Sequence, residues 1–388
     1  MSFKWNLPTK VLFGPGTIKK LHKEKMPGKK ALLLISNGKS VKTNGVLAAV
    51  EAELKEAGVE YVIFDKIQAN PLETTMMEGV MAARENGCDF VIGLGGGSVM
   101  DSATVIAGVA PQKEGRVWDY IFGGTGGGQK MKEKSLPYIA ITTSAGTGSE
   151  VDCWGVVSNP ETHEKIGFMG AYPTLAIVDP ETMLSVPPKF TAYQGFDALF
   201  HCLEGYLSAM ANEASEMVEL TAVRNIAKYL PVAVKDGSNL EARTKVAFAN
   251  TLGGYSMEFS TCTSEHAIEH ALSGHHQELP HGAGLIMISK AYYEHFANSH
   301  QVDDRLIELA KALGREDAKD SMDMVDALVD LQKACGVDDL KMSDYGIKPE
   351  EFPTMAVDAR KTMGGLFKCD RIKLTDEDVI EILNKSYK

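Results

Sequence analysis

The sequence lacks three features that would assign it to a specialised class of protein. Its six cysteines include no C-x-x-C pair, so their spacing indicates neither a zinc finger nor a disulfide framework. No apolar run approaches the roughly 18 residues of a membrane span, and the segment MSFKWNLPTK lacks the hydrophobic region of a signal peptide. We therefore expect a cytoplasmic protein with no membrane partner.

Basic residues are scarce relative to acidic ones. Lys and Arg number 40 against 52 Asp and Glu, which gives a formal net charge of -12. Because no basic stripe offsets this charge, we expect no nucleic-acid partner. Any phosphate group of a ligand must then be bound by a local group of residues. The length of 388 residues exceeds the size at which single hydrophobic cores stop growing, so two domains are expected.

The first half of the chain alternates β-rich and helical stretches. Strand-like runs occur at ALLLIS (31–36), YVIF (61–64) and FVIGL (90–94), with helical stretches between them. Two more strand-like runs follow at YIAITTS (138–144) and LAIVDP (175–180). This order predicts a parallel sheet with helices on its faces.

Helical periodicity dominates after the segment SVPP (185–188). Stretches such as 214–230 and 302–313 repeat apolar residues at helical spacing, and no convincing strand is found beyond SVPP. We predict an α/β domain over residues 1–186 and an all-α domain over residues 187–388.

A glycine-rich loop follows the strand-like run FVIGL and opens a helical stretch. It contains Gly95, Gly96, Gly97 and Ser98, with Asp101 shortly after them. Such a loop exposes backbone N–H groups and the positive end of a helix dipole, which together bind phosphate. The pattern is neither G-x-G-x-x-G nor a P-loop, and a plain strand-to-helix turn is the alternative interpretation.

A second polar loop, ITTSAGTGSE (141–150), also follows a strand. Its hydroxyl groups, suited to phosphate, ribose or amide contacts, belong to Thr142, Thr143, Ser144, Thr147 and Ser149. Taken alone it would be an ordinary loop. Two such loops at the carboxyl ends of strands mark the crevice where open α/β sheets bind ligands, so a dinucleotide is expected.

Aspartate and histidine residues recur at helical spacing in the second half. Asp197 and His201 lie four residues apart, as do His266 and His270, so each pair projects from one helix face. With His281 of LPHGAG, this set suits Fe²⁺ or Zn²⁺. For any single histidine here, a satisfied core or surface residue is the favoured interpretation, and only the set as a whole points to a metal.

Other residues near this set are not expected to bind metal. His275 and His276 follow Gly274 in an expected loop, so we predict that they are solvated surface. Cys202 is rotated about 100° from His201 on a helix, which argues against it as a ligand.

Four motifs in order carry a family resemblance. GGGSVMD, ITTSAGTGSEV, FDALFH and the H-x-x-x-H…PHG series resemble the iron-containing (group III) alcohol dehydrogenases, and within them the butanol dehydrogenase and broad aldehyde reductase branch. The resemblance implies a dehydroquinate synthase-like fold, with an N-terminal nucleotide-binding domain, a helical C-terminal domain and an active site in the cleft between them. It also implies a homo-oligomer, a dimer or larger.

The resemblance assigns roles to individual residues. It implies that the metal ligands are Asp197, His201, His266 and His281, and that His270 faces the substrate and nicotinamide and relays protons. The cofactor contacts that it implies are Asn70, Gly96, Gly97, Ser98, Asp101, Thr143, Ser144, Thr147 and Lys165.

The turn after the first strand-like run bears on the choice of cofactor. NAD-using relatives tend to place an aspartate there, whereas this turn contains Asn37, Gly38, Lys39 and Ser40. A lysine at such a position accommodates a 2′-phosphate, so we predict a preference for NADP(H). The alternative is that Lys39 is a solvated surface charge.

Several positions depart from the family pattern. Thr104 stands where a lysine is usual, and MEFSTCTSE (257–265) replaces a run that is usually small and apolar. Glu258, Thr263 and Glu265 in this run favour a polar substrate if they line the pocket, or are surface residues if they do not.

The expected function is hydride transfer between NAD(P)(H) and a primary alcohol or aldehyde, in the direction of aldehyde reduction with NADPH. One alternative is a dehydroquinate synthase-like lyase, which needs a pocket rich in lysine and arginine. The other is a non-enzymatic nucleotide-binding protein in which the metal is a structural clamp.

Overall fold

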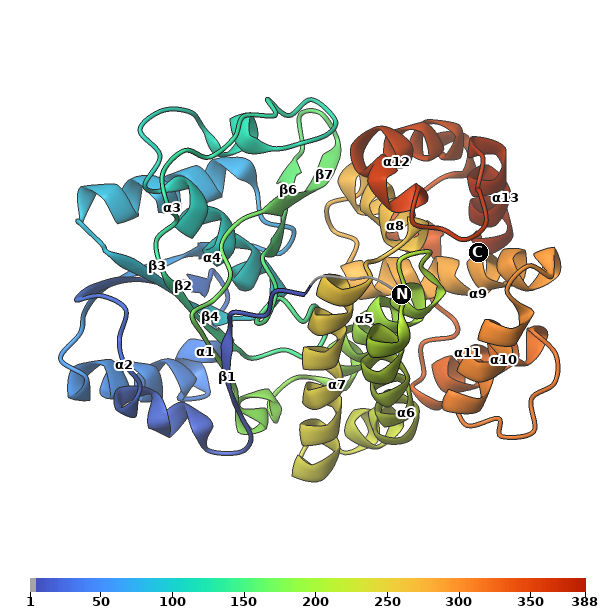
Figure 1. Cartoon of the computed structure of the whole chain (residues 1–388), viewed down its shortest axis with the longest axis horizontal. Helices are drawn as coiled ribbons and strands as arrows, with labels where there is room; N and C mark the ends of the chain where they lie inside the picture. The colour runs from blue at the N-terminus through green and yellow to red at the C-terminus, as the bar shows by residue number, and fades with distance from the viewer. Residues whose placement is uncertain (1–4) are drawn as a thin grey trace.

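A computed structural model describes residues 5–388 and shows a sheet-based part beside a helical part (Figure 1). The sheet has six strands in the order β1-β8-β5-β4-β2-β3, and every neighbouring pair is parallel. The strands are β1 (Lys10–Phe13), β2 (Lys30–Ser36), β3 (Glu60–Ile67), β4 (Phe90–Gly95), β5 (Tyr138–Thr142) and β8 (Leu175–Val178). The predicted parallel sheet is confirmed.

Helices cover both faces of this sheet. They are α1 (Ser40–Thr43), α2 (Val46–Glu56), α3 (Glu73–Glu85) and α4 (Gly97–Val109), with 3-10 turns η1 (Thr17–Lys23), η2 (Val117–Tyr120) and η3 (Pro180–Met183). Leu32 and Leu34 of β2 pack with one core cluster, and Leu33 and Ile35 pack with another. Burial on both faces explains why the predicted strands are nearly continuous apolar runs.

A separate antiparallel hairpin packs against α4. It consists of β6 (Trp154–Asn159) and β7 (Glu164–Met169), and the sequence patterns did not predict it. Thr104 of α4 is buried beside this hairpin, where its hydroxyl donates to the Ala171 carbonyl at 2.8 Å. A Cβ on Gly155 would lie 2.7 Å from the Thr104 side chain, so glycine lets β6 of the hairpin approach α4 closely.

The second part is helical. Its helices are α5 (Pro188–Leu207), α6 (Glu213–Lys235), α7 (Leu240–Phe259), α8 (Ser264–His275), α9 (His281–Ser299), α10 (Asp303–Ala312), α11 (Met322–Ala334), α12 (Phe352–Phe367) and α13 (Asp376–Ser386), with 3-10 turns η4 (Met342–Tyr345) and η5 (Pro349–Glu351). Beyond β8, the described residues pair as strand only in one isolated bridge, Ser208 with Asp370. The fold class, α/β followed by all-α, is confirmed.

Helix α5 runs through the centre of the helical part. All residues from Thr191 to Leu207 are buried except Gln194. Helix α7 packs against α5, and Gly253 of α7 faces Ala198, His201 and Cys202 of α5. Side chains on α5 therefore project into the interior of the protein.

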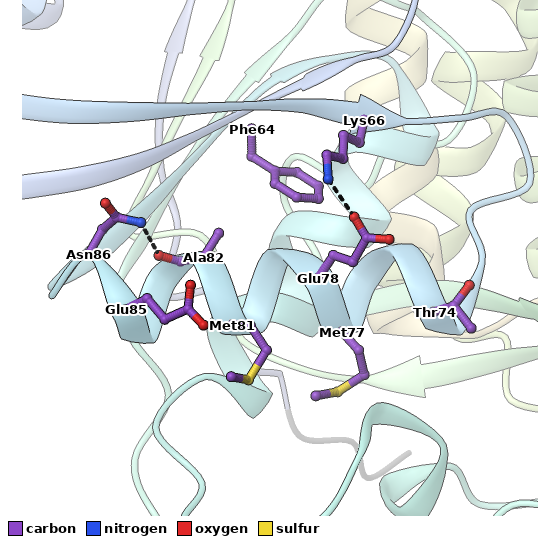
Figure 2. A pocket seen from close by; sticks show the side chains of 9 residues that line it. All are labelled: Phe64, Lys66, Thr74, Met77, Glu78, Met81, Ala82, Glu85 and Asn86. Atoms are coloured by element: carbon purple, nitrogen blue, oxygen red, sulfur yellow. Dashed lines mark hydrogen bonds and ion pairs between the residues drawn. The ribbon is translucent and has the colours of Figure 1, made fainter.

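A surface pocket between β3 and α3 lies away from the predicted site residues (Figure 2). Phe64, Lys66, Met77, Glu78 and Met81 are among its lining residues, and the Lys66 ammonium is paired with the Glu78 carboxylate at 2.7 Å. No predicted cofactor or metal residue lines it. Within residues 5–388, no helix has the length and apolar character needed to cross a membrane.

Candidate metal and nucleotide site

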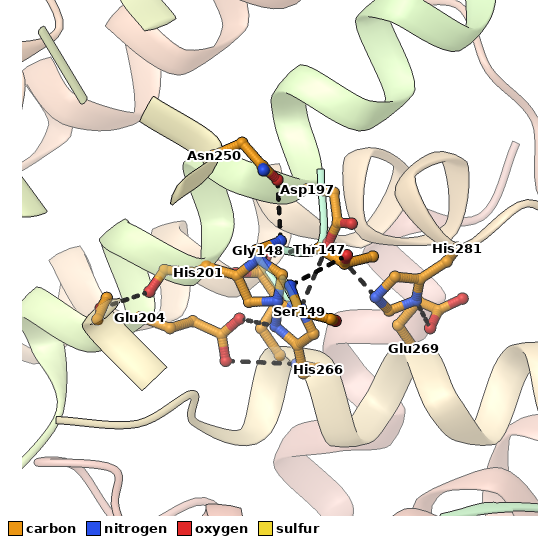
Figure 3. Close-up of polar contacts among 12 residues, drawn as sticks. Thr147, Gly148, Ser149, Asp197, His201, Glu204, Asn250, His266, Glu269 and His281 are labelled. Atoms are coloured by element: carbon orange, nitrogen blue, oxygen red, sulfur yellow. Dashed lines mark hydrogen bonds and ion pairs between the residues drawn. The ribbon is translucent and has the colours of Figure 1, made fainter. Parts of the chain in front are cut away.

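Three imidazoles surround one carboxylate oxygen in the helical part (Figure 3). Asp197 Oδ1 lies 3.8 Å from Nδ1 of His201, 3.6 Å from Nε2 of His266 and 3.5 Å from Nε2 of His281. Asp197 and His201 come from α5, whereas His266 comes from α8 and His281 from the start of α9. The structure therefore brings together the four residues that the resemblance implied as metal ligands.

Three of the four facing atoms of this set have no hydrogen-bond partner within residues 5–388. In the described part of the chain, Asp197 Oδ1, His201 Nδ1 and His266 Nε2 are buried side-chain atoms that remain unsatisfied. Buried polar atoms almost always have partners, so such a convergence needs an explanation. A divalent cation bound by nitrogen and oxygen fits these donors, and Asp197, His266 and His281 have the mutual spacing of metal ligands.

Two buried glutamates hold the outer ring nitrogens of these histidines. Nδ1 of His266 is hydrogen-bonded to Glu204, and Nδ1 of His281 to Glu269. A carboxylate at Nδ1 fixes the tautomer that leaves a lone pair on Nε2, and such partners commonly orient metal-binding histidines. The sequence interpretation missed both glutamates, although each stands three residues after a predicted ligand, His201 or His266.

Despite burial, the pKa of His266 is raised well above its ordinary value by Cys262, Glu204 and Asp197. Burial keeps the other three imidazoles of this site, those of His201, His270 and His281, neutral. It lowers the pKa of His201 to about 4. It also lowers the pKa of His281 and His270 well below the ordinary value, and the nearby Lys165 ammonium adds to that shift. Neutral imidazoles retain the lone pair that metal binding or proton acceptance requires.

His270 lies one helical turn beyond His266 on α8. Its ring centroid is 5.4 Å from that of His281 and 6.4 Å from that of His266. Its Nδ1 is buried without a hydrogen-bond partner among the described residues. His270 is thus beside the Asp197 set, with a nitrogen free to accept a proton.

The two predicted polar loops meet at the beginning of α4. A Cβ on Gly97 would lie 2.4 Å from Thr147, and one on Gly96 would lie 3.3 Å from the Ser144 hydroxyl. The first N–H groups of α4, those of Gly97 and Ser98, precede the hydrogen-bond ladder of the helix and are suited to an anion. The two loops therefore form one polar surface at the carboxyl ends of β4 and β5.

The second loop also reaches the metal set. A Cβ on Gly146 would lie 2.9 Å from Asp197 Oδ2, so only glycine allows the loop to approach this closely. The loop is anchored to α7, where the Asn250 side chain accepts from the backbone N–H of Gly148 at 2.8 Å. The nucleotide candidates and the metal candidates therefore adjoin each other.

Three predicted cofactor residues lie close to the loops or to α8. Asp101 is buried in α4, and burial raises its pKa to about 8. The Lys165 ammonium is buried beside α8, 2.9 Å from the Ser273 hydroxyl and 3.4 Å from Glu269. The Asn70 amide donates to the backbone carbonyl of Gln277 at 2.8 Å and holds the segment between α8 and α9.

The predicted 2′-phosphate residues follow the carboxyl end of β2, which pairs in parallel with β4. Asn37, Gly38, Lys39 and Ser40 are exposed at the end of β2 and the start of α1. The backbone N–H of Asn37 donates to the Ile67 carbonyl at 2.8 Å, which ties this turn to β3. These residues are not in contact with the Asp197 set.

The prediction that His275 and His276 are solvated surface is wrong. His275 ends α8, pairs with Asp358 of α12 at 2.8 Å and stacks on the His163 ring. His276 pairs with Glu351 at 3.1 Å, and both side chains are about 15% exposed. The carboxylates that cover these imidazoles are 83 and 75 residues away in sequence, so local sequence patterns do not reveal them.

Two of the three unusual polar residues are buried and bonded to other helices. Glu265 is fully buried and accepts from the Tyr293 hydroxyl at 2.6 Å. The Thr263 backbone and hydroxyl both donate to Glu204. Glu258, which is partly buried, is the acceptor for the Tyr172 hydroxyl. Each residue has a partner within the protein, and none is a freely solvated side chain.

Comparison with known proteins identifies close likenesses over the whole chain. Residues 8–180 match a family model described as iron-containing alcohol dehydrogenase, and residues 191–387 match the C-terminal model of the Fe-containing alcohol dehydrogenase family. The chain is 31% identical over 395 residues to 1,3-propanediol dehydrogenase of Citrobacter freundii, covering 99% of both chains. It is 30% identical over 396 residues to NADH-dependent butanol dehydrogenase A of Clostridium acetobutylicum, covering 100% of both.

A solved structure gives the same result for the fold. An archaeal halo-thermophilic alcohol dehydrogenase from a Red Sea brine pool superposes with a TM-score of 0.94 at 36% identity, covering 100% of this chain and 99% of that one. The likeness includes both the sheet and the helical part, which confirms the dehydroquinate synthase-like arrangement.

Proposed function

This chain belongs to the iron-containing alcohol dehydrogenase family and is an oxidoreductase acting on alcohols or aldehydes, and we propose that it reduces aldehydes with NADPH at a metal site. The observation that carries the proposal is the convergence of three imidazole nitrogens on Asp197 Oδ1, at 3.5 to 3.8 Å. The ligands that we propose are Asp197, His201, His266 and His281.

The bound cation, Fe²⁺ or Zn²⁺, supplies Lewis-acid polarisation of the substrate oxygen, and the nicotinamide supplies or accepts the hydride. The chain's own residues prepare that chemistry. Glu204 and Glu269 orient two of the proposed ligands through their Nδ1 atoms. Asp197 is buried, and its surroundings exclude water from the position of the substrate oxygen. Without water, electrostatic interactions with that oxygen are stronger.

His270 is proposed to move the proton of the substrate oxygen. Its Nδ1 has no partner among the described residues, and its neutral form accepts a proton when an alcohol is oxidised. In aldehyde reduction the protonated form returns that proton. Its position beside His266 and His281 supports this role.

The nucleotide is proposed to lie along the two adjoining loops. Gly96, Gly97 and Ser98 offer backbone N–H groups for the phosphates at the start of α4. Residues proposed to contact the rest of the cofactor are Asn70, Asp101, Thr143, Ser144, Thr147 and Lys165. The contact of the second loop with Asp197 supports a nicotinamide bound next to the metal.

Lys39 is proposed to select NADPH together with Asn37, Gly38 and Ser40. Lys39→Ala should lower kcat/KM for NADPH about 10-fold, because one charge-assisted contact to the 2′-phosphate is lost. The value for NADH should stay unchanged. Initial rates with each cofactor test this, and Lys42→Ala is the matched control because Lys42 is already paired with Asp65 at 2.7 Å. A wild-type enzyme that clearly prefers NADH, as the name of one relative indicates for that protein, would contradict the proposal.

Glu204 is expected to tune metal affinity without contacting the cation. Glu204→Gln should weaken binding about 10- to 100-fold, because the amide no longer holds the His266 ring as a carboxylate does. Competition with a chromophoric chelator measures the affinity. Glu219→Gln is the control, since Glu219 is equally buried but, among the described residues, its hydrogen-bond donors are all serine hydroxyls. Equal affinities for the two variants would show that Glu204 does not act through His266.

Neither alternative function is favoured. A dehydroquinate synthase-like lyase needs several cations around the substrate, whereas within residues 5–388 the one cation next to the Asp197 set is Lys165, already bound to Glu269 and Ser273. If the metal only held the helices together, the two polar loops beside the metal set would have no explanation. The named relatives are alcohol dehydrogenases.

A panel of neutral and anionic aldehydes and alcohols tests the proposed reaction. We expect the protein to reduce short primary aldehydes with NADPH faster than it oxidises the matching alcohols with NADP⁺. Absence of turnover with every aldehyde, by a protein of known metal content, would contradict the proposed activity.

We also propose a cytoplasmic homo-oligomer, a dimer or larger. The six cysteines are all free, as expected in a reducing compartment. Light scattering at working concentration measures the mass, and a value of 42.0 kDa would indicate a monomer and contradict the assembly.

A further inference from the structure

We propose that Cys262 is a further ligand at the metal site, so that its sulfur and the ring nitrogens of His201 and His266 bind a borderline divalent cation such as Zn²⁺ or Co²⁺. The proposed function uses only nitrogen and oxygen ligands, and this inference adds a sulfur ligand to them. It rests on the metal site of the proposed function. It concerns a residue in the run MEFSTCTSE, one of the segments in which the chain departs from its family's usual pattern.

The Cys262 thiol lies against two of the proposed ligands. Its Sγ and one ring nitrogen of each of His201 and His266 are all within 4.8 Å of one another. The two imidazole rings are stacked, with centroids 4.5 Å apart. Cys262 is 7% exposed, so the thiol faces the interior. This spacing allows one cation to contact all three atoms after small side-chain adjustments.

The histidines in this group have unused ring nitrogens. His201 and His266 are 5% and 4% exposed, yet Nδ1 of His201 and Nε2 of His266 have no hydrogen-bond partner in the described chain. Buried imidazole nitrogens that lack partners point to a missing cation more strongly than a thiol alone. His266 belongs both to this group and to the group of Asp197 and His281, so the two sets share one site.

The position of Cys262 is held by its neighbour. Thr263 donates to Glu204 from its backbone N–H at 2.6 Å and from its hydroxyl at 3.0 Å. Glu204 also binds the outer nitrogen of His266. One carboxylate thus fixes both the ring of His266 and the backbone next to Cys262, which keeps the thiol at the metal site.

A sulfur ligand changes which cation the site favours. Thiolates select softer ions such as Zn²⁺, whereas carboxylate and imidazole alone select less strongly. On coordination the thiol releases its proton to solvent, and no oxidant or reductant is needed. Cys262 forms no disulfide, so its sulfur is available.

Cobalt binding to the metal-free, full-length protein tests this inference. Cobalt bound to sulfur shows a strong near-ultraviolet charge-transfer band, and cobalt bound to any of these ligands shows weaker visible bands. We expect both in the wild type, and loss of only the near-ultraviolet band in Cys262→Ser. Cys202→Ser should keep both bands, because Cys202 is buried next to His201 in sequence but belongs to none of the candidate ligand groups.

The other possible results distinguish a wrong role for Cys262 from a wrong metal site. Visible bands without the near-ultraviolet band in the wild type, or a band that persists in Cys262→Ser, overturn the role of Cys262 and leave the Asp197 site intact. Absence of all cobalt bands overturns the proposed metal site as well. X-ray absorption of the zinc-loaded wild type needs no variant, and we expect a sulfur neighbour at about 2.3 Å. A shell of nitrogen and oxygen alone would contradict the inference.

Discussion

Asp197→Ala is expected to lose the bound cation and to lower kcat/KM for aldehyde reduction about 1,000-fold or more. Asp197 supplies the one carboxylate oxygen that faces three imidazole nitrogens, at 3.5 to 3.8 Å. Without it the cation loses its anionic ligand, and Lewis-acid stabilisation worth several kcal/mol disappears from the transition state. Elemental analysis of the purified variant and initial rates with NADPH measure the two losses together.

The control for this variant is another buried aspartate. Asp152 is fully buried and accepts from the backbone N–H of Trp154 at 2.8 Å, but it belongs to none of the candidate ligand groups. Asp152→Ala should therefore keep its metal even if its thermal stability falls. If Asp197→Ala retained a full equivalent of metal and the wild-type rate, the proposed ligand set would be wrong.

His270→Ala is expected to keep the cation and to lower kcat about 10²- to 10⁴-fold, the usual contribution of a positioned proton-transfer group. His270 lies beside His281 and His266 but is not in the candidate ligand group of Asp197, and its Nδ1 has no partner in the described chain. Metal content, kcat and its pH profile should be measured together. Loss of the proton relay removes the titration of His270 from that profile, which a purely structural defect would not do.

His275→Ala provides the matched control on the same helix. His275 is also an imidazole near the end of α8, but it pairs with Asp358 of α12 and not with the metal set. Its removal should leave kcat and metal content close to those of the wild type. Metal loss in His270→Ala as severe as in His266→Ala would assign His270 to the ligands instead.

Most of the fold was predictable because its strands and helices have strong periodic patterns. Strands β2 and β4 are buried on both faces, so their sequences are long apolar runs. Strand β1 has only four residues at the sheet edge, and β6 and β7 form a hairpin with an exposed Trp154 and Met169. Short edge strands and partly exposed hairpins carry too little pattern to be predicted.

The candidate site was predictable where helical spacing decides which side chains share a face. Asp197 with His201, and His266 with His270, follow this rule and come together in the structure. The proposed roles of Glu204, Glu269 and Cys262 depend on tertiary contacts among α5, α8, α9 and the segment before α8, which one sequence does not reveal. The same reason explains the wrong prediction for His275 and His276, whose acidic partners lie on or just before α12.

The most direct test of the proposed metal site is removal and restoration of the cation. The wild-type protein is stripped with a chelator under anaerobic conditions, and one metal at a time is returned while NADPH-dependent aldehyde reduction is followed. We expect activity to fall in proportion to metal content and to return when about one equivalent of Fe²⁺ or Zn²⁺ is bound. A metal-free protein that reduces aldehydes at the wild-type rate would contradict the claim that Asp197, His201, His266 and His281 hold a catalytic cation.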